Sequence, residues 1–228
     1  MTESPGNFIS LLVKYWSFLI DQVELLNVLS EQNERWEPMA ESEELQLQWA
    51  IDSLAKDEFF SQMTVEDQQR IIREAIDFGA HIAEKTREKL GVPLGAESVR
   101  QMLVSLGCGV RVDDASDLPG PMSEYEEDLV AARFYTLRVR RRAASAIERG
   151  EWNAGWYELY AQCIARELFH HVENTGSGKA SHHIRLRTRL MGLLPVSRPV
   201  ETAREIACLV FVKDFLGLPE VPLLMRDE

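Results

Sequence analysis

Apolar residues recur at helical spacing along most of this chain. They return every three or four residues, which is the period of one face of an α-helix. The segment 65–90 shows the signals most completely, because Thr64 and Asp67 form a capping signal before it and Gly91 follows its end. On this basis we expect helices over residues 8–29, 45–60, 65–90, 96–106, 156–173 and 200–216.

A small β-structure is predicted in the middle of the chain. Val110 and Val112 alternate with polar residues, and the segment 129–139 has the β-branched and aromatic content of a strand. Between them, residues 113–128 are rich in turn formers and are expected to form a loop that could cap a cleft. From Ala143 onward the helical pattern resumes. The sequence therefore predicts an α+β fold that is mainly helical.

A break in the pattern divides the chain into two parts. Gly91 and Pro93 stop the long helix, so residues 1–92 are interpreted as a helical N-terminal extension and residues 93–228 as a separate domain. Within the second part, the Gly- and Ser-containing segment 174–180 is expected to be a flexible loop.

The first expected helix, 8–29, is strongly apolar but is interrupted by Lys14, Asp21 and Glu24. A spanning helix needs about 20 consecutive apolar residues, so we expect a packed helix and no membrane span. An interfacial or dimerising helix is the alternative. The chain opens with no secretory signal, and its three cysteines form no C-x-x-C pair, which is typical of a cytoplasmic protein.

The amino-acid composition and net charge limit the kinds of partner that the chain is expected to bind. The 228 residues are 45% hydrophobic, which is enough to bury a core, and the formal net charge is −12. This acidic balance opposes attraction to nucleic acid or anionic lipid, so no direct nucleic-acid partner is expected. Two arginine runs, within 138–142 and 185–198, are interpreted as solvated faces rather than phosphate sites.

The helix expected over 156–173 carries the main candidate chemistry. Glu167, His170 and His171 fall on the same side of this helix as its apolar residues. Burying a carboxylate or an imidazole without a partner costs several kcal/mol. We therefore expect a partner, which could be a metal ion, a substrate or other polar side chains. The apolar residues on that side are Trp156, Leu159, Tyr160, Cys163 and Ile164.

The last expected helix also places ionisable side chains on an apolar face. Glu201 and Glu205 share a face with Cys208, Val212 and Phe215 at i, i+4, i+7, i+11 and i+14. If the two helix faces oppose one another, their polar groups could hold a divalent metal ion such as zinc. The candidate metal ligands are His170, His171, Glu201 and Glu205.

The order of these parts resembles the ImmA/IrrE type of zinc metallopeptidase-like proteins. In those proteins a helix, a strand, a loop and a short sheet precede a helix with an H-E-x-x-H-like motif, and an acid-bearing helix follows. The similar pieces here are residues 99–112, 132–136, 163–171 (CIARELFHH) and 201–219.

This resemblance implies a zincin-like core for residues 93–228 with a bound zinc ion. It gives Glu167 the general-base position and His170 the second ligand position, with Glu201 or Glu205 as the acidic ligand. The family also implies a repressor-like protein as a possible partner.

One residue departs from the family motif: Arg166 occupies the position of the first zinc-binding histidine. A guanidinium has no lone pair to offer a metal. The first hypothesis is therefore a degenerate relative with a regulatory or protein-binding role, in which Arg166 bonds Glu201 or Glu205 and no metal is bound.

Three alternatives stay open. A substitute ligand such as His171 could complete an active metal-dependent hydrolase with Glu167 as its base. The spacing Glu167-Leu-Phe-His170 also fits one half of a di-iron carboxylate site, although that motif normally occurs twice. Finally, the polar groups could satisfy one another without any ligand, with the two histidines at the helix end interacting with its dipole.

Overall fold

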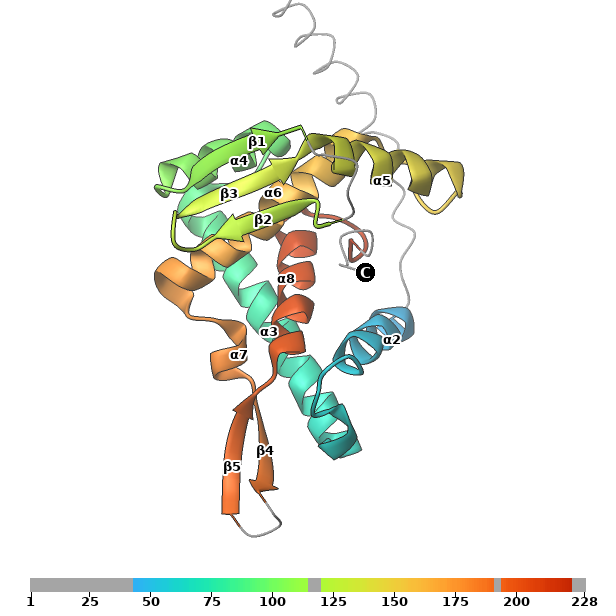
Figure 1. Ribbon diagram of the computed structural model, residues 1–228, viewed down its shortest axis with the longest axis vertical. Coiled ribbons are helices and arrows are strands. Elements are labelled where there is room, and N and C mark those ends of the chain that lie inside the picture. Colours follow the sequence, from blue (N-terminus) through green and yellow to red (C-terminus); the bar gives the residue numbers. More distant parts are fainter. Residues whose placement is uncertain (1–42, 115–119, 191–193, 223–228) are drawn as a thin grey trace, which may run out of the picture. The chain divides into compact units, whose positions relative to one another are not determined.

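The computed structural model describes residues 43–114, 120–190 and 194–222, all within one compact unit that spans residues 40–228 (Figure 1). The fold is α+β and mainly helical, as predicted. In these described ranges, no helix combines the length and apolar character needed to cross a bilayer. The expected helix at 8–29 lies outside the described residues.

Groups of helices and groups of strands follow one another along the chain. The helices are α2 (Glu43–Leu54), α3 (Val65–Leu90), α4 (Ala96–Ser105), α5 (Thr136–Glu148), α6 (Trp156–Val172), α7 (Ala180–His183) and α8 (Glu201–Leu216). The strands are β1 (Gly109–Asp113), β2 (Ser123–Glu126), β3 (Ala131–Tyr135), β4 (Arg185–Leu190) and β5 (Leu194–Pro199). Short 3₁₀ and π turns occupy Phe60–Gln62 and Glu173–Ser177.

The bounds predicted for α3, α4, α6 and α8 agree with the structure to within one residue. Helix α3 has the predicted bounds because the Thr64 hydroxyl accepts a hydrogen bond from the Asp67 amide at 3.1 Å. Gly91 ends the helix with a φ of 89°, which a residue with a Cβ rarely adopts. Helix α2 ends six residues before the predicted limit of 60.

The β-structure differs from the prediction in three places. The strand expected over 129–139 ends at Tyr135, and the chain continues as α5 because Val139, Ala143 and Ala146 recur at helical spacing and are buried. The expected loop 113–128 contains β2. The hairpin β4–β5 was not predicted, and the expected loop 174–180 is largely a π turn.

The three-stranded sheet has the order β1-β3-β2, with β1 parallel and β2 antiparallel to the central strand β3 (Figure 1). Its central strand buries Ala131, Ala132 and Phe134. Helix α6 packs against β2 and β3, and α4 packs against α6 and β1. This arrangement brings the side chains of the edge strand β2 onto the helix that carries the candidate residues.

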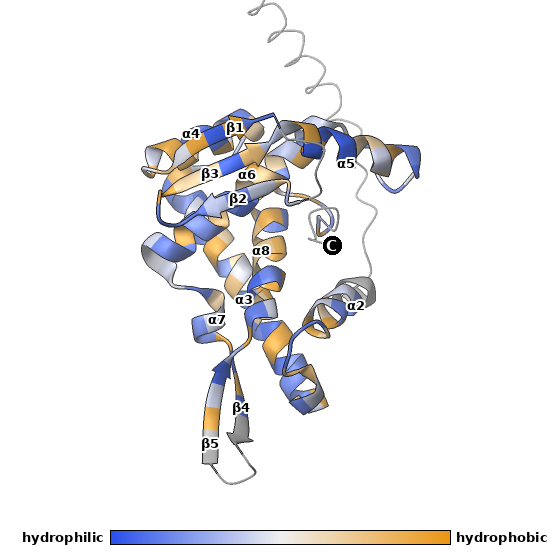
Figure 2. Ribbon diagram, in the orientation of Figure 1, coloured by the Kyte–Doolittle hydropathy of each residue, from blue (hydrophilic) through white to orange (hydrophobic). Residues whose placement is uncertain are grey.

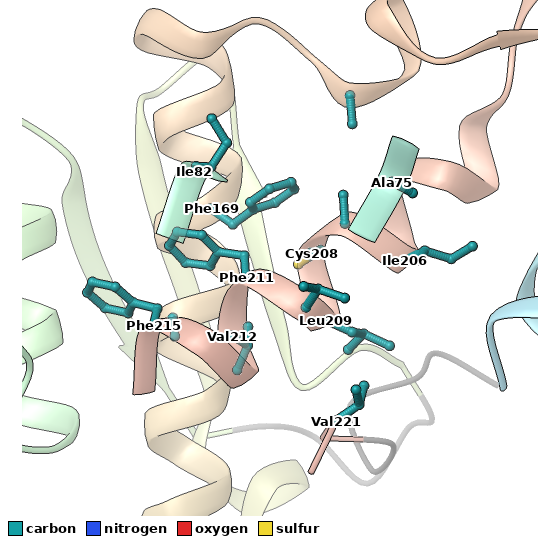
Figure 3. Packing of buried hydrophobic residues seen from close by; sticks show 14 of the residues in the cluster. Ala75, Ile82, Phe169, Ile206, Cys208, Leu209, Phe211, Val212, Phe215 and Val221 are labelled. Carbon is teal, nitrogen blue, oxygen red and sulfur yellow. The ribbon is translucent and has the colours of Figure 1, made fainter. Parts of the chain in front are cut away.

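Helix α8 forms the centre of the core. Hydrophobic positions recur along it (Figure 2), and α3, α6, α7 and α2 all contact it. Figure 3 shows the side of this core where α6 meets α8, with the Phe169 and Phe211 rings 5.3 Å apart. The buried residues of α8 include Ile206, Cys208, Leu209, Phe211, Val212 and Phe215.

The packing of α3 corrects the predicted domain boundary at residue 92. Helices α2 and α3 lie in the same compact unit as the residues that follow, because α3 packs along α8. The apolar face of α3, which includes Ile71, Ile72, Ala75 and Ile82, covers the flank of α8. Residues 43–90 are therefore part of the core rather than part of an extension.

The α3–α8 contact is closest at Gly79. A Cβ atom at this position would overlap the carbonyl oxygen of Ala207 on α8. Glycine is otherwise unfavourable inside a helix by about 1 kcal/mol relative to alanine. Its presence here allows the two backbones to approach one another.

We expect Gly79→Ala to lower the free energy of unfolding by at least about 1 kcal/mol, because overpacking against backbone outweighs the gain in helix propensity. Asp77→Ala, at an exposed position on the same helix, should change the free energy by less than about 0.5 kcal/mol. Urea denaturation measures both variants. A Gly79→Ala protein as stable as the wild type would contradict this close approach.

Candidate functional site

Three acidic or imidazole side chains on α6 and the turn after it are buried. Glu167, His171 and Glu173 are each at most 1% exposed, and the side chain of His170 is 13% exposed. Their burial follows from the position of α6, which lies between the sheet on one side and α8 on the other. Glu167 and His171 have partners on β2, and Glu173 has its partners on α8 and α7.

Glu167 is held by the edge strand β2. The Ser123 hydroxyl donates to Glu167 Oε1 at 2.6 Å, which is a short, charge-assisted distance. Arg166 Nη1 lies 3.5 Å from the same oxygen and donates to the Ser123 carbonyl at 3.4 Å. The other carboxylate oxygen, Oε2, is buried and has no hydrogen-bond partner within the described part of the chain. Glu167 therefore faces the protein interior rather than an open cleft.

His171 is held at both ring nitrogens. Its Nδ1 lies 2.9 Å from the Tyr125 hydroxyl on β2, and its Nε2 lies 3.3 Å from the Leu106 carbonyl after α4. The carbonyl can only accept, so in the neutral ring Nε2 carries the proton and Nδ1 accepts from the tyrosine. Burial lowers the pKa of His171, although the Leu106 carbonyl opposes that shift. The ring is held as a neutral imidazole.

Glu173 links the end of α6 to α8. The π turn after α6 places its carboxylate inside the protein, where Arg204 Nε donates to Oε2 at 2.7 Å and the Ala180 amide donates to Oε1 at 2.8 Å. His170 Nδ1 lies 3.5 Å from Oε2. Burial by itself would raise the pKa of Glu173, but the hydrogen bonds from His170 and Ala180 and the charge of Arg204 together hold this pKa below its usual value.

The predicted acidic ligands on α8 occupy other surroundings. Glu201 is exposed and Glu205 is half-buried in the first turns of the helix. No hydrogen bond or ion pair joins either carboxylate to Arg166, His170 or His171. Arg204, which lies between the two glutamates in sequence, instead donates to Glu173 in the turn after α6.

The residues at this centre do not fit a divalent metal ion. Both nitrogens of His171 are engaged, and the guanidinium groups of Arg166 and Arg204 lie at the carboxylates of Glu167 and Glu173, where a cation would have to bind. Within the described ranges, no group of three or more His, Cys, Asp or Glu residues is arranged to hold an ion. The structure does not bring His170, His171, Glu201 and Glu205 together as a ligand set.

The cysteines around this centre have low reactivity. All three are buried and free. Burial raises the pKa of Cys108 to about 11 and that of Cys163 to about 12, and it also raises the pKa of Cys208. A protonated thiol is a poor nucleophile, so none of the three is suited to nucleophilic catalysis.

Comparisons with known proteins do not place this centre in a family. No protein-family model, no curated protein and no solved structure matches the chain.

Four partners of the α6 groups were missed from the sequence. Ser123 and Tyr125 lie in the segment interpreted as a loop, although their alternation with Glu124 and Glu126 is the pattern of a strand with one face buried. Glu173 and Arg204 are ordinary surface residues by type. Only the path of the chain after α6 brings these two side chains together.

We expect Arg204→Met to lower the free energy of unfolding by about 2 kcal/mol, because it leaves the Glu173 carboxylate buried without its cation. Adding Glu173→Met should recover a substantial part of that loss, since no unpaired charge then remains. Arg73→Met, at an exposed position on α3, is the matched control. Chemical denaturation of the wild type, these three variants and Glu173→Met measures the coupling, and a loss below about 0.5 kcal/mol in Arg204→Met would contradict the role of the pair.

We also expect stability to fall as the pH drops below about 6.5, because unfolded His171 takes up a proton near that pH while the folded protein resists it. In His171→Gln the amide can still donate to Leu106 and accept from Tyr125 but cannot become charged. Its melting temperature should therefore change less between pH 7.5 and pH 5.5, on the order of half the wild-type change. His81→Gln, at an exposed site on α3, should retain the wild-type profile.

Proposed function

We propose that this chain is a zincin-like protein that works without a catalytic metal, as a regulatory or protein-binding relative of the ImmA/IrrE-type peptidases. The observation that carries the proposal is the pair of guanidinium groups, Arg166 and Arg204, at the two buried carboxylates of α6 and its C-terminal turn. Arginine supplies there the positive charge that a metal ion supplies in a metallopeptidase.

The order of elements supports the zincin-like part of the proposal. Helix α4 leads into β1, the three-stranded sheet precedes α6, and α8 follows α6 along the core, which is the order that the resemblance implies. The segment α7–β4–β5 lies between α6 and α8. The position of Glu167 beneath the edge strand β2 fits the same arrangement.

The burial and hydrogen bonding of Glu167 argue against a peptidase mechanism. A general base must come within hydrogen-bonding distance of the water that it activates. Glu167 has no exposed surface, and its Oε1 atom is already bonded to Ser123. The buried carboxylate of Glu167 therefore has a structural role. The function of the domain then depends on the surface of the domain. By family resemblance, the partner class is a repressor-like protein.

The proposal is tested by metal content and metal dependence. Protein purified without chelator should contain less than ~0.1 zinc, iron or manganese per chain, and its melting temperature should change by less than ~1 °C with EDTA or with added zinc. The casein-hydrolysing activity of the wild type and of Glu167→Gln should be equally negligible. About one metal ion per chain that EDTA removes, or hydrolysis that Glu167→Gln abolishes, would overturn the proposal.

A further inference from the structure

The hairpin β4–β5 has backbone edges and arginine side chains that take no part in the α6 centre. It lies at the opposite end of α8 from the three-stranded sheet (Figure 1) and contains two strands only. At its base Leu186 is buried, and Arg70 of α3 donates to the Arg185 carbonyl at 3.2 Å. A two-stranded sheet is marginally stable in water and has two unpaired edges, so the state of each edge matters.

The register fixes which backbone groups face outward. The Val200 amide donates to the Ile184 carbonyl at 3.3 Å, so this pair is a hydrogen-bonded pair of the antiparallel ladder. The alternation of such pairs makes Arg185 with Pro199, and Arg187 with Ser197, non-hydrogen-bonded pairs. The amide and carbonyl groups of these residues therefore point away from the partner strand. Pro199 occupies a position where no ladder hydrogen bond needs its missing N–H.

The two edges of the hairpin are not equivalent. On β5, Pro195 and Pro199 have no N–H to offer, and the Ser197 carbonyl already accepts from Arg185 Nη2 at 2.7 Å. On β4, the Arg185 carbonyl is occupied by Arg70, but no described residue pairs with the outward amide and carbonyl of Arg187. The β5 edge therefore offers little for strand pairing, whereas among the described residues the β4 edge is unpaired at Arg187.

The open edge is also basic. Arginine occupies every second residue of β4, at positions 185, 187 and 189. The Arg187 side chain is exposed, and no described residue forms an ion pair with it. A second copy of this chain pairing through β4 would place arginines beside arginines, which is unfavourable. Strand pairing also requires backbone N–H and C=O groups in the partner, which an extended protein segment has and a nucleic acid lacks.

We propose that the outer edge of β4 is a docking site for an extended acidic segment of another protein, which adds as a third strand and places carboxylates at alternate positions beside Arg187 and its neighbours. The added backbone hydrogen bonds supply affinity, and the alternating charges select the partner and its register. This site is separate from the α6 centre and does not rest on the absence of a metal.

The test uses a fluorescein-labelled peptide in which Glu and Thr alternate, with binding to the full chain followed by fluorescence anisotropy. Arg187→Glu should weaken binding by at least ~10-fold, and Arg187→Lys by less than ~3-fold, since it keeps the charge. Arg73→Glu makes the same charge change at an exposed site on α3 and should alter binding by less than ~2-fold. No detectable binding at ~1 mM protein, or equal losses in Arg187→Glu and Arg73→Glu, would overturn the proposal.

Two further probes separate strand addition from simple charge attraction. The peptide is N-methylated at alternate residues, in one version along one edge and in another along the opposite edge. Strand addition predicts that one version binds at least ~10-fold more weakly than the other, because only one edge faces β4. Equal binding of both versions contradicts strand addition. A single-stranded oligonucleotide that binds more tightly than the peptide and depends equally on Arg187 would overturn the choice of an acidic protein segment.

Discussion

The enclosure of α8 is the constraint on which the rest of the structure depends. This helix is apolar on nearly every side, so neighbours must cover it all round. Helix α3 can lie against one flank because Gly79 lets its backbone approach Ala207, and α6 covers another through the contact between Phe169 and Phe211. With α8 fixed in this way, its first turns come beside the end of α6, and Arg204 reaches Glu173.

The polar groups on α6 then serve as connections between layers. Glu167 is bonded to the edge strand through Ser123, His171 to Tyr125 and to the end of α4, and Glu173 to α8 through Arg204. Burying each group is costly in isolation, and the cost is offset only when its partner is in place. Such bonds favour one arrangement of helix, sheet and α8 over alternatives with similar hydrophobic burial. The same hydrogen bonds occupy Glu167 Oε1, both ring nitrogens of His171 and both carboxylate oxygens of Glu173.

The sequence predicts the bounds of an element well when the element is long and when residues at its ends give local start and stop signals. Helix α3 was predicted to its exact ends because the signals at Thr64 and Gly91 are local. Strand β2 was missed because four residues offer too short a pattern among many turn formers, and its identity depends on pairing with β3. The sequence indicates buried polar groups on α6, but the contact with α8 joins Arg204 to Glu173 in the turn after α6, and it does not use Glu201 or Glu205.

By itself, the sequence determined the mainly helical α+β class, the bounds of the longer helices and the existence of polar groups on a buried face of α6. These properties depend on spacing along the chain, which the order of residues contains directly. Only the tertiary structure decided that residues 43–90 belong to the core, which partners satisfy Glu167 and His171, and which edge of the β4–β5 hairpin is open. Those outcomes depend on contacts between residues that are far apart in sequence, and on small differences among large, opposing packing and solvation free energies.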